Sequence, residues 1–173
     1  MTGGDVEREL RSILRGDNDF IYDFTMNLPD DIKLNYVKII NHPFVVARAA
    51  GSFGIDLIAI RNDFSFPIEV KSSSQRVIRL SRNKRIKEQA EWLKRECLRA
   101  KILPIYAYRL KRIRNEDPWR IFTLPLEEGG VEGRSRFLYN LLPKLELTLK
   151  GNLKLDWKTG MPLHKLIEYL CTN

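Results

Sequence analysis

Hydrophobic residues recur along the chain with two different periods, and each period predicts one kind of element. From Val6 to Leu14 they return every three or four residues, which predicts an amphipathic helix over residues 5–15. The same spacing returns over residues 86–100, where Lys and Arg occupy the other helix faces. We therefore expect a second amphipathic helix there, with Ser81 as its N-cap.

Shorter runs rich in Val, Ile and aromatic residues predict β-strands between and after these helices. Two runs in the tail alternate strictly on either side of a Gly-containing turn, which is typical of a β-hairpin. A short helix is expected over 162–170, and residues 32–40 fit either a helix or a strand. The predicted strands cover residues 44–47, 55–60, 66–70, 105–110, 119–124, 145–149 and 153–157.

The order of these elements predicts an α/β fold with a central mixed β-sheet flanked by helices. The 173 residues, 43% hydrophobic and 30% charged, suit a single domain over 1–173. We place its core at about 5–124, insertions at about 17–41 and 125–143, and a hairpin–helix extension at about 143–173. The chain has neither a long apolar run nor a signal peptide, so we expect a cytoplasmic protein without membrane contact.

The few cysteines and histidines limit the metal chemistry that the chain can support. Cys97, Cys171, His42 and His164 are the only residues of these two types, and they are far apart in the sequence. This spacing excludes a structural zinc site or a disulfide framework. A metal site would therefore rest on carboxylates, which favours magnesium or manganese.

Positive charge is concentrated in one quarter of the chain. The whole sequence carries a formal charge of +8, but from Lys71 to Arg114 there are 15 basic and 3 acidic residues, a local charge of +12. Lys and Arg can simply keep the outer face of a helix in water. The concentration nevertheless favours a basic patch for nucleic acid.

Candidate chemistry lies at Glu69-Val70-Lys71, at the end of the third predicted strand. Because strand side chains alternate, Glu69 and Lys71 project from the same face. Asp56 lies at the start of the preceding strand, flanked by apolar residues, which is unusual for a simple core position. If the two strands form a hairpin, Asp56 and Glu69 are close, and the two carboxylates can hold a hard cation beside Lys71.

This arrangement resembles the PD-(D/E)XK nuclease fold, in which an Asp precedes a strand ending in Glu-x-Lys, between an acidic and a basic helix. Further segments resemble, in order, the archaeal-type Holliday junction resolvases. The similar segments are Glu7–Leu10 (EREL), Phe44–Ser52 (FVVARAAGS), Ile55–Ala59 (IDLIA), Ile68–Ser72 (IEVKS), Trp119–Phe122 (WRIF) and, more weakly, Met161–Ile167 (MPLHKLI). The chain departs from that family in lacking a basic N-terminal arm and in adding most of 17–41.

The resemblance implies four catalytic residues, Glu7, Asp56, Glu69 and Lys71. It implies that Glu7, Asp56 and Glu69 hold Mg²⁺, with Mn²⁺ as a possible substitute, and that Lys71 positions the attacking water and stabilises charge at phosphorus. Helical periodicity alone does not choose between Glu7 and Glu9, which flank the apolar stripe at similar angles. The family pattern chooses Glu7, and Glu9 is then expected to be a solvated acid.

DNA contacts are expected from the loop before Asp56, from the end of the third strand and from the start of the basic helix. Such residues would hold phosphates without reading sequence. The predicted DNA-binding residues are Arg48, Ser52, Ser72, Arg76, Arg79, Arg82, Lys84 and Arg85.

The resemblance implies a magnesium-dependent, structure-specific DNA endonuclease that resolves four-way junctions by paired nicks, acting as a homodimer at the nucleoid. Two other functional hypotheses stay open. The same four residues would serve a restriction or repair nuclease that acts on duplex or flap DNA. Alternatively, the chain is a non-catalytic accessory protein that binds branched DNA.

Overall fold

The computed structural model describes residues 2–49, 54–80, 84–127, 129–147 and 152–172. The helices are α1 (Gly3–Leu14), α2 (Asn18–Thr25), α3 (Asp30–Val37), α4 (Lys84–Ala100), α5 (Gly133–Leu141) and α6 (Leu163–Thr172), with short 3₁₀ turns η1 (Lys38–Asn41) and η2 (Trp157–Thr159). The strands are β1 (Val45–Arg48), β2 (Leu57–Ile60), β3 (Ser65–Ser73), β4 (Val77–Arg79), β5 (Ile105–Leu110), β6 (Trp119–Phe122), β7 (Glu146–Leu147), β8 (Leu153–Asp156) and β9 (Met161–Pro162).

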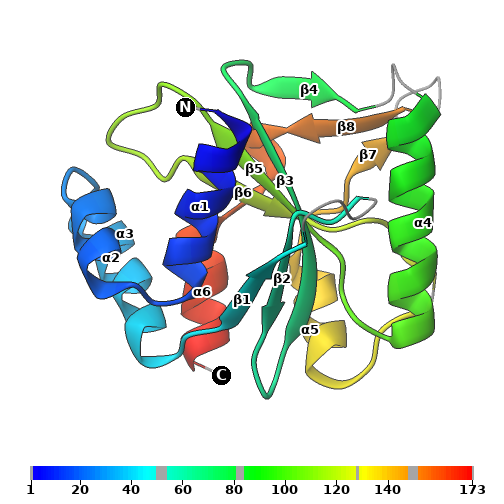
Figure 1. Cartoon of the computed structure of the whole chain (residues 1–173), viewed down its shortest axis with the longest axis horizontal. Coiled ribbons are helices and arrows are strands. Elements are labelled where there is room, and N and C mark those ends of the chain that lie inside the picture. Colours follow the sequence, from blue (N-terminus) through cyan, green and yellow to red (C-terminus); the bar gives the residue numbers. More distant parts are fainter. Residues whose placement is uncertain (1, 50–53, 81–83, 128, 148–151, 173) are drawn as a thin grey trace.

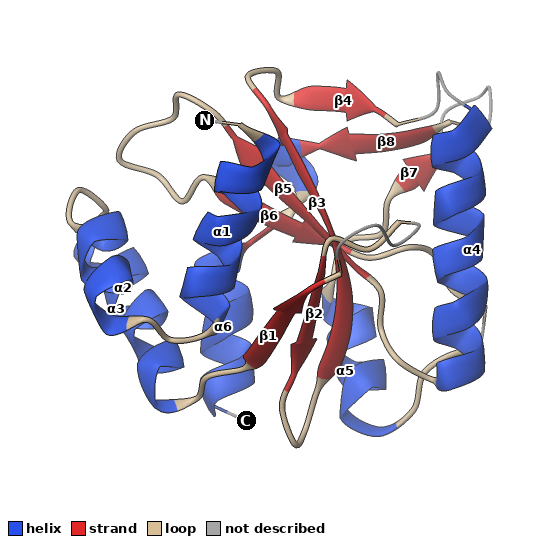
Figure 2. Ribbon diagram, viewed as in Figure 1, coloured by secondary structure: helices blue, strands red, loops and turns tan. Residues whose placement is uncertain are grey.

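A six-stranded mixed sheet runs through the middle of the molecule in the order β1-β2-β3-β5-β6-β9 (Figure 2). β3 and β5 are parallel, as the crossover through α4 requires, and the other neighbours are antiparallel. A smaller sheet, β4-β8-β7, lies beside it. The predicted α/β class with a central mixed sheet flanked by helices is confirmed.

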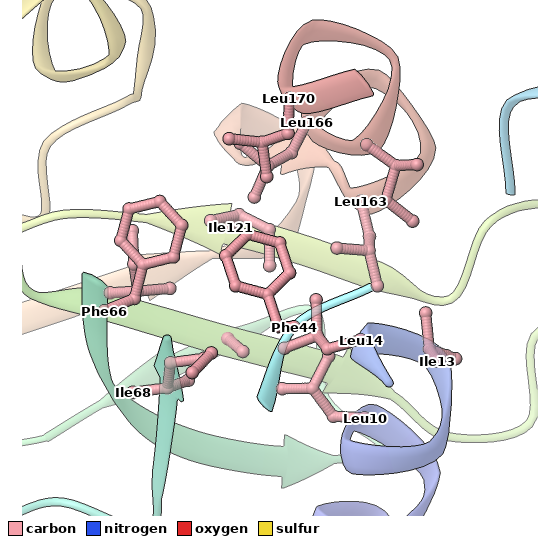
Figure 3. Packing of buried hydrophobic residues seen from close by; sticks show 14 of the residues in the cluster. Leu10, Ile13, Leu14, Phe44, Phe66, Ile68, Ile121, Leu163, Leu166 and Leu170 are labelled. Carbon is pink, nitrogen blue, oxygen red and sulfur yellow. The ribbon is translucent and has the colours of Figure 1, made fainter. Parts of the chain in front are cut away.

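Helices cover both faces of the large sheet (Figure 1). On one face, α1, α3 and α6 bury the larger hydrophobic cluster, and Figure 3 shows Leu10, Leu14 and Leu166 converging with Phe44 and Phe66. On the other face, α4 and the smaller sheet enclose a second cluster, to which β5 contributes alternate side chains. We call these the α1 face and the α4 face.

The segment 17–41, which the sequence predicts as an insertion, forms the helices α2 and α3 and the turn η1, and α2 packs beside α1. Gly16 makes the turn between α1 and α2 with φ of +65°, and a Cβ there would lie 2.9 Å from the backbone oxygen of Ile39. A side chain at residue 16 would therefore push the insertion away from α1.

A buried polar cluster ties this insertion to the core. Asp117, 1% exposed, accepts hydrogen bonds from the Tyr36 hydroxyl of α3 (2.9 Å), the Trp119 amide (2.8 Å), and both the amide (2.9 Å) and Nδ1 (2.7 Å) of His164 in α6. Because a carboxylate only accepts, His164 carries its proton on Nδ1. Tyr36, Asp117 and His164 form what we call the Asp117 cluster.

Most predicted elements are present, including both amphipathic helices, the C-terminal helix and the hairpin of β7 and β8. Four helices or strands were not predicted: α2, α5 within 125–143, β4, which pairs with β8, and the two-residue strand β9, which pairs with β6. The choice left open at 32–40 is settled as helix over most of that range. Ser81, the expected N-cap of α4, lies outside the described residues. Within the described ranges, no helix is long and apolar enough to cross a membrane.

Candidate active site

Asp56 lies at the junction of three strands, where β2 begins. Its amide donates to the Ile68 carbonyl of β3 (2.9 Å), and its own carbonyl accepts from the Ala49 amide after β1 (2.9 Å). Its carboxylate accepts from the Val70 amide of β3 (2.7 Å). The side chain is thus fixed against the middle of β3, as the predicted hairpin requires.

Glu69 and Lys71 project from β3 on the α4 face. Val70 between them packs against the larger cluster on the α1 face, and the register pairs Glu69 with Tyr106 and Lys71 with Tyr108 of β5. The Lys71 ammonium donates directly to the Glu69 carboxylate. Glu69 is 7% exposed, whereas 27% of the Lys71 side chain is exposed, so the site is open to solvent on the lysine side.

The two carboxylates of Asp56 and Glu69 interact directly. Burial raises the pKa of Glu69, the Lys71 ammonium opposes that rise, and the charge and hydrogen bonding of Asp56 add to it. Burial, with the charges of Glu69 and Asp56, also raises the pKa of the neighbouring Tyr106 phenol. We call Asp56, Glu69 and Lys71 the carboxylate–lysine cluster.

Glu7 lies apart from the other two predicted metal ligands. It belongs to α1, and its carboxylate forms an ion pair with Arg48 of β1 (2.6 Å). Among the described residues, no three Asp, Glu, His or Cys side chains come together as a metal-binding set. The structure therefore brings together three of the four predicted catalytic residues and holds Glu7 with Arg48, a predicted DNA contact.

Asp56 and Glu69 have the chemistry that a hard divalent cation requires. Among the described residues, the Asp56 carboxylate accepts from the Val70 amide and the Glu69 carboxylate accepts from the Lys71 ammonium, which leaves oxygen lone pairs unused on both acids. Magnesium is commonly held by one or two carboxylates and keeps several water ligands. The donor set of this pair thus fits magnesium without a third protein ligand.

The predicted DNA contacts differ in their exposure and in the sheet face on which they lie. Arg76, Arg79 and Arg85 are exposed, in the turn after β3, in β4 and in the first turn of α4. Ser72 is half-buried and shares the strand face of Val70, so it lies on the α1 face and not beside Lys71. Ser52, Arg82 and the side chain of Lys84 lie outside the described residues.

The expectation that Glu9 is a solvated acid is wrong. Glu9 is 7% exposed, and its carboxylate accepts from Nε of Arg109 (2.5 Å) and from Nε1 of Trp119 (2.8 Å). Both partners come from the far half of the chain, so no local pattern marks this role. Glu9 and Glu7 thus differ sharply: one lies inside the α1 face, the other at its rim.

Comparisons with known proteins find similarity to solved structures. No protein-family model matches the chain, and no curated protein matches it. A solved structure of Hjc, a Holliday junction resolvase from the archaeal hyperthermophile Archaeoglobus fulgidus, is similar with a TM-score of 0.46 and 19% sequence identity, covering 84% of this chain and 89% of that chain.

Proposed function

We propose that the protein is a magnesium-dependent, structure-specific DNA endonuclease whose substrate is the four-way junction. The observation that carries this proposal is the carboxylate–lysine cluster, in which two acids and an ammonium from neighbouring strands meet at a site that is open to solvent on the lysine side. The concentration of Lys and Arg between Lys71 and Arg114 supports a phosphodiester as the substrate.

Each member of the cluster has a distinct task in this proposal. Asp56 and Glu69 would hold Mg²⁺, or Mn²⁺ as a substitute, which supplies charge neutralisation at the phosphate and activates water. Lys71 would place its ammonium against a phosphate oxygen and stabilise the charge that develops there. Glu7 would enter the metal shell through water or after leaving Arg48.

The proposal also concerns the assembled protein. Resolving a four-way junction takes two nicks in strands of like polarity, and a two-fold homodimer supplies two equivalent sites at a fixed separation. We propose such a homodimer, acting at the nucleoid in the cytoplasm. Sedimentation of the free protein and of its junction complex measures the stoichiometry.

The decisive experiment compares cleavage of an end-labelled four-way junction with cleavage of a matched linear duplex, with magnesium or with EDTA. The proteins are the wild type, Lys71→Ala and the control Lys165→Ala, which removes an exposed lysine from α6. We expect paired nicks in the junction alone, lost in EDTA and reduced at least about 100-fold in Lys71→Ala. Junction affinity should remain close to the wild type, because distributed phosphate contacts supply it.

The other outcomes are equally informative. Efficient cleavage of the linear duplex would favour a restriction or repair nuclease built on the same cluster. Tight junction binding without cleavage in any divalent metal would favour a non-catalytic accessory protein. Equal loss of binding and cleavage in folded Lys71→Ala would contradict the catalytic role of that residue.

A further inference from the structure

The β5–β6 loop (residues 111–118) stands at the same end of the sheet as the carboxylate–lysine cluster. It is the yellow-green loop at the upper left of Figure 1. β3 and β5 run parallel, with Lys71 opposite Tyr108 and Ser73 opposite Leu110. The loop therefore begins where β3 ends, three residues beyond Lys71, which corresponds to about 10 Å of strand.

Two solvent-open grooves border this loop, and they meet at Ile113. One, of about 410 Å³, is lined by the turn after β3 and the first half of the loop. The other, of about 550 Å³, lies between the loop and the turn joining α2 to α3. The first is lined by Ser74, Gln75, Arg76, Leu110, Lys111, Arg112 and Ile113, and the second includes Asn27, Arg109, Arg114 and Glu116.

Cationic residues outnumber acidic residues in the lining of both grooves. The first groove has three cationic residues, Arg76, Lys111 and Arg112, and no acid in its lining. In the second, Arg109 is neutralised by Glu9 and Glu116 by Arg120 (3.0 Å). Arg112 and Arg114 are exposed, and neither has a carboxylate partner within the described part of the chain.

Hydrogen bonds to β3, to Pro118 and to Trp157 fix the base of the loop. The Lys111 amide donates to the Ser73 carbonyl (2.8 Å), and the Leu110 amide closes the loop on the Pro118 carbonyl (2.9 Å). The Trp157 indole donates to that same Pro118 carbonyl (3.1 Å), while the Trp157 amide donates to the Arg76 carbonyl (2.8 Å). Both walls of the first groove thus share Trp157 as an anchor.

The backbone inside the loop is also fixed in an unusual conformation. Arg112 has φ of +62° and Asn115 has φ of +57°, in the left-handed region that L side chains enter at a cost. Because the base of the loop is hydrogen-bonded and these two residues have restricted dihedral angles, the backbone positions of Arg112 and Arg114 are fixed. Preorganised cations bind a fixed anion with less loss of entropy than mobile ones.

We propose that the β5–β6 loop is a second phosphate-binding element, which holds the backbone of a DNA duplex arm through Arg112 and Arg114. The inference rests on the proposed function, because it places this arm next to the phosphodiester cut at the carboxylate–lysine cluster. Arg76, from the turn after β3, borders the same track. The α2–α3 insertion forms its far wall, so the insertion limits which DNA shapes fit.

The test is DNA binding in EDTA, measured against salt concentration for a labelled four-way junction and a linear duplex. The double variant Arg112→Ala/Arg114→Ala is compared with the wild type and with Arg134→Ala/Arg136→Ala, which removes two exposed arginines from α5 at the opposite end of the molecule. Arg112→Lys/Arg114→Lys keeps the charge and controls for folding.

If each arginine neutralises one phosphate, the slope of log affinity against log salt falls by about 2 in the double alanine variant. The dissociation constant for both DNAs should then rise about 100-fold at 0.1 M salt, because affinities that differ by about 2 in slope converge near 1 M salt. The lysine variant should keep most of the slope, and the α5 control should match the wild type.

The inference and the proposed function fail in different ways. If the folded double alanine variant binds DNA with the wild-type slope while the wild type still cuts junctions, the loop does not bind phosphate and the nuclease proposal stands. If the wild type binds no DNA, both fail. If the α5 control weakens binding as much as the loop variant, the effect is one of total charge and the loop inference is overturned.

Discussion

The carboxylate–lysine cluster and the Asp117 cluster both place acids at the large sheet, but they differ in how many hydrogen bonds the carboxylates accept. Asp117 is fully buried and accepts four hydrogen bonds on its two oxygens. In the described structure Glu69 receives one donor, Lys71, and faces the second acid, Asp56. Asp117 has no oxygen lone pair left for a ligand. Asp56 and Glu69 have unused lone pairs, and their charges repel each other.

This difference separates acids that hold the fold from acids that are free to do chemistry. A buried charge whose lone pairs are filled by fixed donors is expensive to disturb and contributes to a defined structure. Two adjacent carboxylates with unfilled lone pairs are an unfavourable arrangement for stability alone. They become favourable when a cation is shared between them.

The largest expected effect comes from Glu69→Gln, which removes one charge from the carboxylate–lysine cluster. We expect junction cleavage to fall at least about 100-fold, because the oxygen pair that would hold the metal is lost. The free energy of unfolding should change by no more than about 1 kcal/mol, since the repulsion from Asp56 disappears together with the Lys71 pair. Cleavage rates and urea denaturation measure the two quantities.

Glu96→Gln is the matched control, since it makes the same chemical change in a partly exposed residue of α4 that pairs with Arg99. It should leave cleavage and stability near the wild type. A Glu69→Gln protein that cuts junctions at the wild-type rate would place the chemistry elsewhere. One that unfolds far more easily would make Glu69 a structural acid like Asp117.

Asp117→Asn is expected to lower stability and to leave cleavage intact, in contrast to Glu69→Gln. The amide nitrogen of Asn cannot accept, so two of the four donors lose their partner in a buried site. We expect a loss of about 3 kcal/mol in unfolding free energy, which lowers Tm by about 6–12 °C in a domain of this size. Thermal unfolding followed by circular dichroism measures it.

Asp23→Asn provides the comparison, because Asp23 is an exposed acid on α2. Its Tm should stay within about 2 °C of the wild type. At a temperature where folded Asp117→Asn persists, its cleavage rate per folded molecule should be close to the wild type. A Tm equal to that of Asp23→Asn would mean that the insertion does not depend on Asp117 for its attachment.

The sequence predicted the carboxylate–lysine cluster because its geometry is local. Strand alternation places Glu69 and Lys71 on one face, and the β2–β3 hairpin brings Asp56 against Val70, which lies between them and is 14 residues away in the sequence. The role of Glu9 was not predictable in this way. Its partners Arg109 and Trp119 are 100 and 110 residues away, and a helical wheel contains neither.

Two of the elements that were missed, α5 and β4, lack a sequence pattern of their own. α5 buries Leu138 but exposes Phe137 and Leu141, so its sequence shows no apolar stripe. β4 has three residues and exists as a strand through its pairing with β8, about 75 positions later in the chain. In both cases tertiary contacts decide the local structure.

The two glutamates of α1 offer a third comparison within one helix. Glu9→Gln leaves Arg109, 14% exposed, without its counter-charge, and should cost about 3 kcal/mol. Glu7→Gln breaks a pair with Arg48, whose side chain is 46% exposed, and should cost less than about 1 kcal/mol. Urea denaturation of both variants measures the difference in unfolding free energy.

The losses of cleavage activity should follow the reverse order, with the larger loss in Glu7→Gln. We expect Glu7→Gln to slow junction cleavage while Glu9→Gln retains it where the protein is folded, because Glu7 is the acid proposed for the metal shell. Wild-type cleavage in Glu7→Gln would remove that residue from the catalytic set and leave Asp56, Glu69 and Lys71. Equal stability of the two variants would contradict the contrast between rim and interior.

The smallest expected effect concerns Asp63, an acid that is paired but near the surface. Arg61 donates to it through Nε (2.6 Å) and Nη2 (2.8 Å), and this hydrogen bonding lowers the pKa of Asp63 in the folded state, with burial opposing it. The unfolded chain therefore takes up the proton first as pH falls. Stability from this pair is complete above the unfolded pKa of about 3.9 and is lost as pH drops through the lower folded value.

Asp63→Asn should accordingly lower the unfolding free energy by about 0.5 kcal/mol at pH 7, and the gap to the wild type should narrow below about pH 4. Urea denaturation of both proteins between pH 7 and pH 3 measures that gap. Arg61 keeps its bonds to the carbonyls of His42 (2.9 Å) and Leu170 (2.7 Å) in the variant, which is why the loss is small. A gap that stays constant over this pH range would mean that the Asp63 charge contributes nothing and that the backbone contacts of Arg61 alone fasten α6 to the turn between β2 and β3.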